Sequence, residues 1–229
     1  MIGFIVALAS ESSNLLKKIP DVHTNIVSGY EVYVLNFFDN HVYLVYSGVG
    51  KVNAAMATQI LIGHFKVTTV INVGSCGGLA SNLAVGDIVI PNVVSYYDVN
   101  LTAFGYRLNQ IPQQPADFDV DQQLNKSLVN ILKLYGNHLS GGKLISGDTF
   151  INQSNIKNFQ IDEKAVAIDM ESAAIAHTCL HNKVSCAFVK VISDVIFLDE
   201  KNAKKWQQNI PNIAKTIEHI IIDVARFLV

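Results

Sequence analysis

Stretches of consecutive hydrophobic residues alternate along this chain with stretches in which hydrophobic residues recur every three or four positions. The first kind, rich in Val, Ile, Phe and Tyr, predicts β-strands. The expected strands are Ile2–Leu8, Glu31–Phe38, Val42–Ser47, Thr69–Val73, Asp87–Tyr97, Lys143–Ser146, Val166–Ile168 and Ala187–Ser193. The second kind predicts helices with one face turned to a core. The expected helices are Ser10–Lys18, Val52–Phe65, Asp121–Tyr135, Met170–His181 and Pro211–Leu228.

The order of these segments predicts an α/β fold, in which helices cover both faces of a mixed sheet. Alternating strands and helices favour parallel pairing, but two consecutive strands joined by Asp39-Asn40-His41 indicate an antiparallel hairpin. The longest segment without a regular pattern is Asn100–Val120, where we expect a functional or interface loop. No internal repeat divides the chain, so residues 1–229 are expected to form one domain.

The composition excludes nucleic acid as a partner. Half of the 229 residues are hydrophobic and 16% are charged, which is enough apolar surface for a sizeable core. The formal charge of −2 is spread along the chain, without the basic stripe that holds a nucleic-acid backbone. Arginine, whose planar fork suits phosphate, occurs only as Arg107 and Arg226.

We expect no membrane association either. Met1–Ala9 is apolar, but it is short and has no basic start, so a first buried strand explains it better than a signal peptide. Val67–Gly86 carries no charge, but its Gly, Ser, Asn and Thr make it a poor membrane span. Cys76, Cys179 and Cys186 have no CxxC spacing, which is typical of reduced thiols in a cytoplasmic protein.

Candidate chemistry lies in carboxylates that follow apolar strands. Asp169-Met170-Glu171 ends one strand directly before a helix, Glu11 follows the first strand, and Asp194 follows Ala187–Ser193. Taken singly, each acid has a structural explanation, because acidic residues cap helices, favour helix N-termini and occur in turns. Strand ends meet at one edge of an α/β sheet, however, where ligands bind. Several acids at that edge suggest acid–base chemistry.

Four further patterns could carry chemistry. Glycine-rich Asn72–Gly78 follows a buried strand and is either a ligand-facing loop or a tight turn. Ser47-Gly48-Val49-Gly50-Lys51 is similar to a phosphate-binding loop but lacks its first glycine and its Ser/Thr. Cys76 has no evident histidine partner, so a small buried thiol is favoured over a nucleophile. His177 and His181 have metal-like spacing without an accompanying acid, so no metal site is expected.

Eight segments in a particular order carry a resemblance that covers nearly the whole chain. They are Ala7–Glu11, Ser47–Val52, Asn72–Leu79, Val85–Val89, Leu101–Tyr106, Ser146–Ile151, Asp169–Glu171 and Ile192–Val195. Together they resemble the 5′-methylthioadenosine/S-adenosylhomocysteine nucleosidases of the nucleoside phosphorylase superfamily. The resemblance implies a three-layer α/β/α sandwich around a mixed, twisted sheet. It also implies that the chain hydrolyses the N-glycosidic bond of a small-molecule nucleoside, without a cofactor, and releases adenine and a 5-thioribose product.

The resemblance implies a role for individual residues. Glu11 matches the carboxylate that activates the attacking water, Asp194 the acid that protonates adenine N7, and Glu171 the residue that binds the ribose hydroxyls. Asp194 must then hold a proton near pH 7 while Glu11 stays ionised, so the two acids need different environments. The other implied contacts are Ser75 beside the water, Met170 against the sugar, Ser193 beside the acid, Phe150 stacked on adenine, and Ile151 bound to it through the backbone.

The 5′ pocket of the substrate is implied to be apolar. Leu8 and Val49 match residues that line it, and Leu101 matches a residue that reaches it from the partner subunit of a homodimer. The loop Asn100–Tyr106 would therefore complete the neighbouring site.

The chain departs from the family pattern near the carboxylates. Asp169 stands where Glu is usual, and Lys190 stands where Arg is common; a lysine supplies the charge without the bidentate geometry. The aromatic residue that closes the pocket near the last helix has two candidates, Phe197 and Trp206. These departures leave the 5′ specificity open.

Three other functions remain as alternatives. A phosphate-dependent nucleoside phosphorylase needs a cationic phosphate site, and the scarcity of arginine argues against it. A hydrolase of aminofutalosine or of another adenine nucleoside would share the catalytic residues and differ in the 5′ pocket. A nucleoside-binding protein without activity should lack at least one of Glu11, Glu171 and Asp194, and all three are present.

Overall fold

The computed structural model describes residues 1–37, 40–136, 138–197 and 202–228. Its strands are β1 (Ile2–Val6), β2 (His23–Val27), β3 (Tyr30–Phe37), β4 (Asn40–Tyr46), β5 (Thr69–Gly78), β6 (Ile88–Ile90), β7 (Val93–Tyr96), β8 (Asp117–Asp119), β9 (His138–Ser140), β10 (Lys143–Ser146), β11 (Ala165–Asp169) and β12 (Ser185–Val195). Its α-helices are α1 (Leu15–Lys18), α2 (Lys51–Gly63), α3 (Gln122–Leu132), α4 (Ser172–Asn182) and α5 (Asn202–Leu228). Short 3₁₀ helices are η1 (Ala9–Ser12), η2 (Thr102–Phe104) and η3 (Ile156–Asn158).

Strand β5 is the centre of the sheet. Its first half pairs in parallel with β1 on one side and with β12 on the other. Beyond β1 the sheet continues through β4, β3 and β2, and the pairs β3–β4 and β2–β3 are antiparallel. Strand β11 pairs antiparallel with the end of β5 and leads through β10 and β7 to β8, while β12 leads through β6 to β9. The expected mixed sheet and the β3–β4 hairpin are confirmed, although Asp39 of its turn lies outside the described residues.

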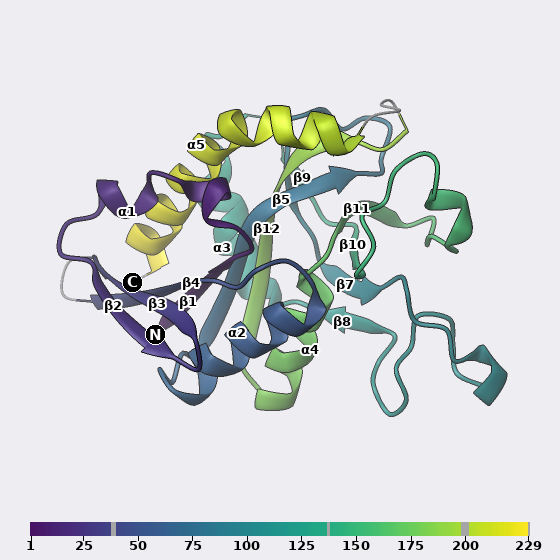
Figure 1. Ribbon diagram of the computed structural model, residues 1–229, viewed down its shortest axis with the longest axis horizontal. Coiled ribbons are helices and arrows are strands. Elements are labelled where there is room, and N and C mark those ends of the chain that lie inside the picture. The colour runs from purple at the N-terminus through teal and green to yellow at the C-terminus, as the bar shows by residue number, and fades with distance from the viewer. Residues whose placement is uncertain (38–39, 137, 198–201, 229) are drawn as a thin grey trace.

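Each face of the sheet has its own hydrophobic core, because successive side chains of a strand point to opposite faces. Phe4 of β1 packs in a cluster with Leu128 of α3 and Ile217 of α5. The next residue, Ile5, belongs to the cluster that contains Leu61 of α2 and Ile175 of α4. Helices α1, α3 and α5 therefore cover one face and α2 and α4 the other, as Figure 1 shows. This arrangement is the expected three-layer sandwich.

The expected elements were wrong in places where glycine or proline occurs. The glycine-rich segment after Val73 is not a loop, because β5 continues to Gly78 and pairs with β12 along its whole length. Tertiary pairing overrides the low strand propensity of glycine there. The expected strand Asp87–Tyr97 is split into β6 and β7 at Pro91, which has no N–H to donate to a ladder.

The helix boundaries also differ from those expected. The segment Ser10–Lys18 forms η1 and α1 rather than one helix, and the last helix begins at Asn202 rather than at Pro211. Strands β2, β8 and β9 were not expected; β2 is an edge strand whose side chains are largely exposed, so it has no hydrophobic pattern. No helix among the described residues combines the length and the apolar character needed to cross a bilayer.

Candidate active site

A pocket opens where β5 loses its neighbour on one side. Strand β1 pairs with β5 as far as Asn72, and β11 pairs with it only at Gly77 and Gly78. In the described part of the chain no strand pairs with this side of β5 between those points. Backbone groups exposed by the gap need other partners. The gap, the segments that follow β1 and β11, the end of β12 and the start of α5 together line the pocket.

Glu11 fills part of this gap. Its Oε1 accepts hydrogen bonds from the backbone N–H of Ser75 over 2.7 Å and from the Ser75 hydroxyl over 2.6 Å. Its Oε2 accepts a third hydrogen bond from the backbone N–H of Leu8 over 3.0 Å. A Cβ at Gly74 would lie 3.3 Å from Oε1, so the glycine leaves room for the carboxylate. Glu11 is only 2% exposed and is held as an acceptor at the pocket wall.

Asp194 reaches the pocket through an irregularity in β12. Ile192 pairs with Cys76 and Asp194 pairs with Gly77, so Ser193 is an extra residue, and such bulges re-aim neighbouring side chains. The Ser193 hydroxyl lies 2.7 Å from Oδ1 of Asp194 and 3.0 Å from the carbonyl oxygen of Cys76. Both Ser193 and Asp194 are buried. The hydroxyl therefore fixes the orientation of the Asp194 carboxyl group.

The start of α5 contributes an aromatic residue. Trp206 lines the pocket, and its Nε1–H donates to the Ser75 hydroxyl over 3.2 Å. Asn209, on the same helix, donates to the carbonyl oxygen of Ser193 over 2.8 Å. Phe197, the other aromatic candidate, is 57% exposed and does not line the pocket. Of the two, the structure brings Trp206 to the site.

Asp169 and Lys190 form a buried ion pair in the wall of the pocket. Lys190 Nζ lies 2.8 Å from Oδ2 of Asp169, and both side chains are 2% exposed. Asp169 also accepts hydrogen bonds from the hydroxyls of Ser146 and Ser172 and from the backbone N–H groups of Glu171 and Ser172. It thus binds the first N–H of α4, although the N-cap residue of that helix is Glu171. Burial alone would raise the pKa of Asp169, but Lys190 and these hydroxyls lower it. Burial likewise opposes the charge on Lys190, but Asp169 and then Glu171 raise its pKa.

Glu171 lies between the ion pair and the N-terminus of α2. Its Oε1 accepts a hydrogen bond from the backbone N–H of Gly50 over 3.0 Å. Burial, and next the charge of Asp169, raise the pKa of Glu171 from 4.5 to about 7, although Lys190 and the Gly50 N–H act in the opposite direction. Glu171 therefore exchanges a proton near neutral pH, unlike an ordinary carboxylic acid.

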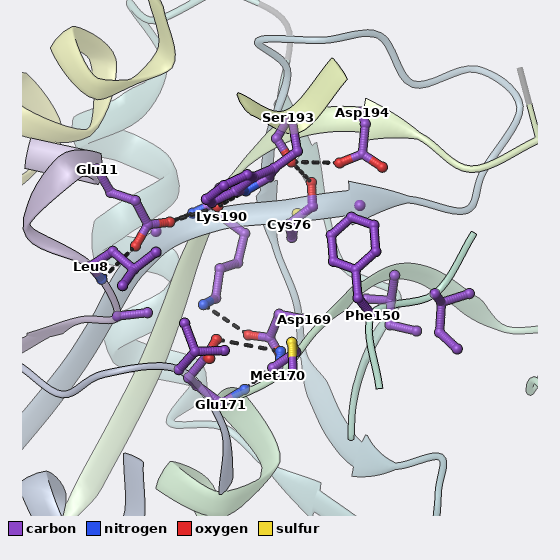
Figure 2. A pocket seen from close by; sticks show the side chains of 18 of the residues that line it. Leu8, Glu11, Cys76, Phe150, Asp169, Met170, Glu171, Lys190, Ser193 and Asp194 are labelled. Atoms are coloured by element: carbon purple, nitrogen blue, oxygen red, sulfur yellow. Dashed lines mark hydrogen bonds and ion pairs between the residues drawn. The ribbon is translucent and has the colours of Figure 1, made fainter. Parts of the chain in front are cut away.

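The structure brings all but one of the expected site residues to this pocket. In Figure 2, Phe150 and Asp194 lie toward one end, Leu8 and Glu11 toward the other, and Met170, Glu171 and Lys190 between them. Ser75, Ser193, Ile151 and Val49 complete the expected set. No protein hydrogen bond involves the Ile151 backbone among the described residues, so its N–H and C=O can bind a ligand. Leu101 precedes η2 and does not line the pocket of its own chain.

Several contacts at the site could not be recognised in the sequence. Gly50 and Glu171 are 121 positions apart, and Asn209 and Ser193 are 16 apart in different elements. No spacing pattern connects these residues. The sequence indicates the Lys190–Asp169 pair only indirectly. A lysine inside an apolar strand must have an acidic partner to be buried, but the sequence does not show which acid it is.

The described residues offer no metal site. No group of three or more His, Cys, Asp or Glu among them could hold a metal ion. The rings of His177 and His181 stack with centroids 5.1 Å apart, and His177 Nδ1 lies 3.1 Å from the Tyr96 hydroxyl. Cys76 lines the pocket, but burial raises the pKa of its thiol, which disfavours the nucleophilic thiolate.

Comparisons with known proteins agree over nearly the full length of the chain. Residues 1–226 match the phosphorylase superfamily. The chain is 39% identical over 223 residues to the 5′-methylthioadenosine/S-adenosylhomocysteine nucleosidase of Haemophilus ducreyi, covering 96% of this chain and 95% of that protein.

Solved structures show the same fold. The S-adenosylhomocysteine nucleosidase of Streptococcus pyogenes, in complex with 5-methylthiotubericidin, has a TM-score of 0.89 and 33% identity, covering 100% of this chain and 97% of that one. The futalosine hydrolase of Helicobacter pylori has a TM-score of 0.88 at 24% identity, covering 98% and 96% of the two chains. At that identity the second likeness concerns the fold alone.

Proposed function

The chain belongs to the phosphorylase superfamily and, within it, to the 5′-methylthioadenosine/S-adenosylhomocysteine nucleosidases, which are hydrolases, and we propose that it hydrolyses the N-glycosidic bond of these two nucleosides. One observation carries the proposal. Three buried carboxyl groups, on Glu11, Glu171 and Asp194, line the same pocket as Phe150. Glu11 and Asp194 suit acid–base chemistry, Glu171 suits the binding of the two ribose hydroxyls, and the Phe150 ring suits stacking on a purine.

Glu11 acts as the general base. It takes a proton from a water molecule as the water oxygen attacks C1′ of the ribose. The hydrogen bonds from Ser75 and Leu8 hold both carboxylate oxygens in place, so the base is positioned before the substrate arrives. Phosphate is not the nucleophile, because neither arginine of the chain lines the pocket, and Lys190, the single cation among the described residues that line it, is paired with Asp169.

Asp194 acts as the general acid. The C1′–N9 bond breaks with its electron pair going to adenine, and Asp194 donates a proton to N7, so the leaving group departs as neutral adenine. Phe150 stacks on the base and Ile151 binds its edge through the free backbone groups. Positive charge that develops on the ribose ring is stabilised by Glu171, which binds the ribose hydroxyls in its ionised form, with Met170 against the sugar.

The 5′ substituent lies in an apolar environment. Leu8 and Val49 offer no side-chain hydrogen bond, and Leu101 of a partner subunit would add a third apolar wall. Such a pocket accepts an alkylthio group and disfavours a hydroxyl by something like 10²-fold. Adenosine should therefore be cleaved, but with a kcat/KM below that of methylthioadenosine. Equal kcat/KM for the two nucleosides would contradict the assigned pocket.

The decisive experiment is incubation with methylthioadenosine and measurement of free adenine, with and without phosphate. We expect adenine and methylthioribose at every phosphate concentration. Release of methylthioribose 1-phosphate would identify a phosphorylase instead. Cleavage of aminofutalosine in preference to methylthioadenosine would keep the reaction and replace the substrate, whereas adenine binding without cleavage would indicate a non-catalytic protein.

A further inference from the structure

Lys51, the first residue of α2, lies outside the pocket in a ring of charged contacts. Its Nζ is 2.7 Å from Oδ2 of Asp98 and 3.5 Å from Oδ2 of Asp148. Its backbone N–H donates to Oδ1 of Asp148 over 2.8 Å. The backbone N–H of Asp148 in turn donates to Oδ2 of Asp98 over 2.9 Å. Three segments that are distant in the sequence are thereby joined at one point.

Asp148 belongs to the segment that carries Phe150 into the pocket. The Tyr97 hydroxyl donates to the carbonyl oxygen of Thr149, between these two residues. A Cβ at Gly147 would lie 2.6 Å from the Tyr97 ring, so only glycine permits this close packing. The segment 147–151 is therefore held from outside, by residues 97–98 on one side and by Lys51 on the other.

The same end of α2 also holds Glu171. The N–H of Gly50, directly before Lys51, donates to Oε1 of Glu171. Gly50 has a φ of +99°, and a Cβ there would meet Asp148 Oδ1 at 3.1 Å, so the turn requires glycine. Two consecutive N–H groups thus bind two carboxylates, one at the sugar end of the pocket and one on the base-facing segment. Negative charge is favoured at a helix N-terminus.

We propose that Lys51 is a positioning residue that keeps Phe150 and Ile151 in register with Glu171. The proposal rests on the proposed function, because it takes Phe150 and Ile151 as the contacts to adenine and Glu171 as the contact to the sugar. The side chains of Lys51, Asp98 and Asp148 do not line the pocket, so Lys51 acts on a substrate only through segment 147–151. Without its charge, the contacts to the base weaken and those to the sugar persist.

Two product fragments test the proposal, because adenine reports on the base end and 5-methylthioribose on the sugar end. We expect Lys51→Met to weaken inhibition by adenine about 3- to 10-fold, as for the loss of one or two partly exposed ion pairs. Inhibition by 5-methylthioribose should be unchanged. Asp148→Asn should act in the same way, and Lys51→Arg should retain adenine binding. The matched control is Lys18→Met, which removes an ion pair of the same length, 2.7 Å to Glu218, away from the pocket.

The possible outcomes separate this proposal from the proposed function. Unchanged adenine inhibition in Lys51→Met, or equal weakening for both fragments, would overturn the positioning role while the wild-type protein still releases adenine from methylthioadenosine. A wild-type protein that neither cleaves methylthioadenosine nor binds adenine would overturn both. Thermal melts and light scattering on every variant show whether the fold and the assembly are kept.

Discussion

Replacing Lys190 by methionine should destabilise the protein strongly, because it leaves Asp169 charged and buried without a counter-ion. The two groups are 2.8 Å apart and both side chains are 2% exposed. At an effective dielectric constant of about 20, unit charges at that separation attract by roughly 6 kcal/mol. The cost of removing the ions from water offsets much of this attraction, and breaking a buried pair from one side costs about 3–5 kcal/mol.

The assay is a double-mutant cycle with thermal and denaturant unfolding. A loss of about 3–5 kcal/mol in Lys190→Met corresponds to a fall in Tm of about 6–20 °C for a chain of this size. The double variant Lys190→Met/Asp169→Asn removes both charges and should recover most of the loss. The amide oxygen, placed at the Oδ1 position, still accepts from the Ser146 hydroxyl, and the amide NH2 at the Oδ2 position can donate to the Ser172 hydroxyl, whose own proton has Asn72 Oδ1 as an acceptor. Lys18→Met is the comparison: its partner Glu218 is also buried, but Lys18 itself is 36% exposed, so water replaces part of its charge and the cost should be smaller than for Lys190→Met.

The cycle also has a catalytic readout, because both charges act on Glu171. Lys190 lowers the pKa of Glu171 and Asp169 raises it. If Glu171 must be ionised, the acidic limb of kcat/KM against pH should move upward in Lys190→Met and downward in Asp169→Asn. It should stay near the wild-type position in the double variant. The reasoning would be refuted by a double variant that is no more stable than Lys190→Met. It would also be refuted if the acidic limb of kcat/KM kept its wild-type position in both single variants.

Three further predictions test the rest of the site. Asp194→Asn keeps the shape of the side chain and loses its proton, so kcat should fall at least about 10²-fold with adenine binding kept, and near-normal turnover would exclude it as the general acid. Burial raises the pKa of Glu171 from 4.5 to about 7. Between these two values the folded protein keeps a proton on Glu171 that the unfolded chain loses. The contribution of Glu171 to the free energy of unfolding should therefore fall as the pH rises from about 5 to 7. Denaturant titrations of Glu171→Gln should show a flatter profile over that window. Light scattering should show a dimer, with about twice the chain mass of 25.1 kDa. The reason is that Phe104 in the Asn100–Tyr106 loop is exposed and needs a partner surface to be hidden from water. An active monomer would refute a site shared between subunits.

The hydrophobic pattern predicted most of the sheet and both of its covering layers, since the central strands are buried on both faces. Strand β1 is buried at every position, which gives a continuous apolar run. Edge strand β2 has mostly exposed side chains, and its pairing with β3 is a backbone property that leaves no mark on the sequence. Likewise, the strand conformation of Gly74–Gly78 is imposed by pairing with β12 and not by local preference.

The candidate carboxylates could be predicted because the end of an apolar run marks the end of a strand. The ends of parallel strands meet at one edge of an α/β sheet, so acids that follow such runs come together there. The protonation states of these carboxyl groups could not be predicted from the order of the strands. Glu171 has a raised pKa because of burial and Asp169, although Lys190 of a different strand opposes the shift. That balance depends on distances between elements, and the sequence contains only their order. Which acid holds a proton is therefore a property of the assembled sheet.

The pocket itself follows from a break in backbone pairing. Had β1 continued beside β5 past Asn72, the N–H of Ser75 would be free to join a ladder, and Glu11 would have no donor there. Because β1 ends and the chain turns through η1, a carboxylate takes the place of a strand carbonyl. The acceptor that satisfies the sheet is then the same group that faces the ligand. The substitution Glu11→Ala thus has two effects, because it removes a candidate base and leaves the N–H of a strand without its acceptor. Glu11→Gln separates the two effects, because it removes the base while its amide oxygen can still accept the hydrogen bond.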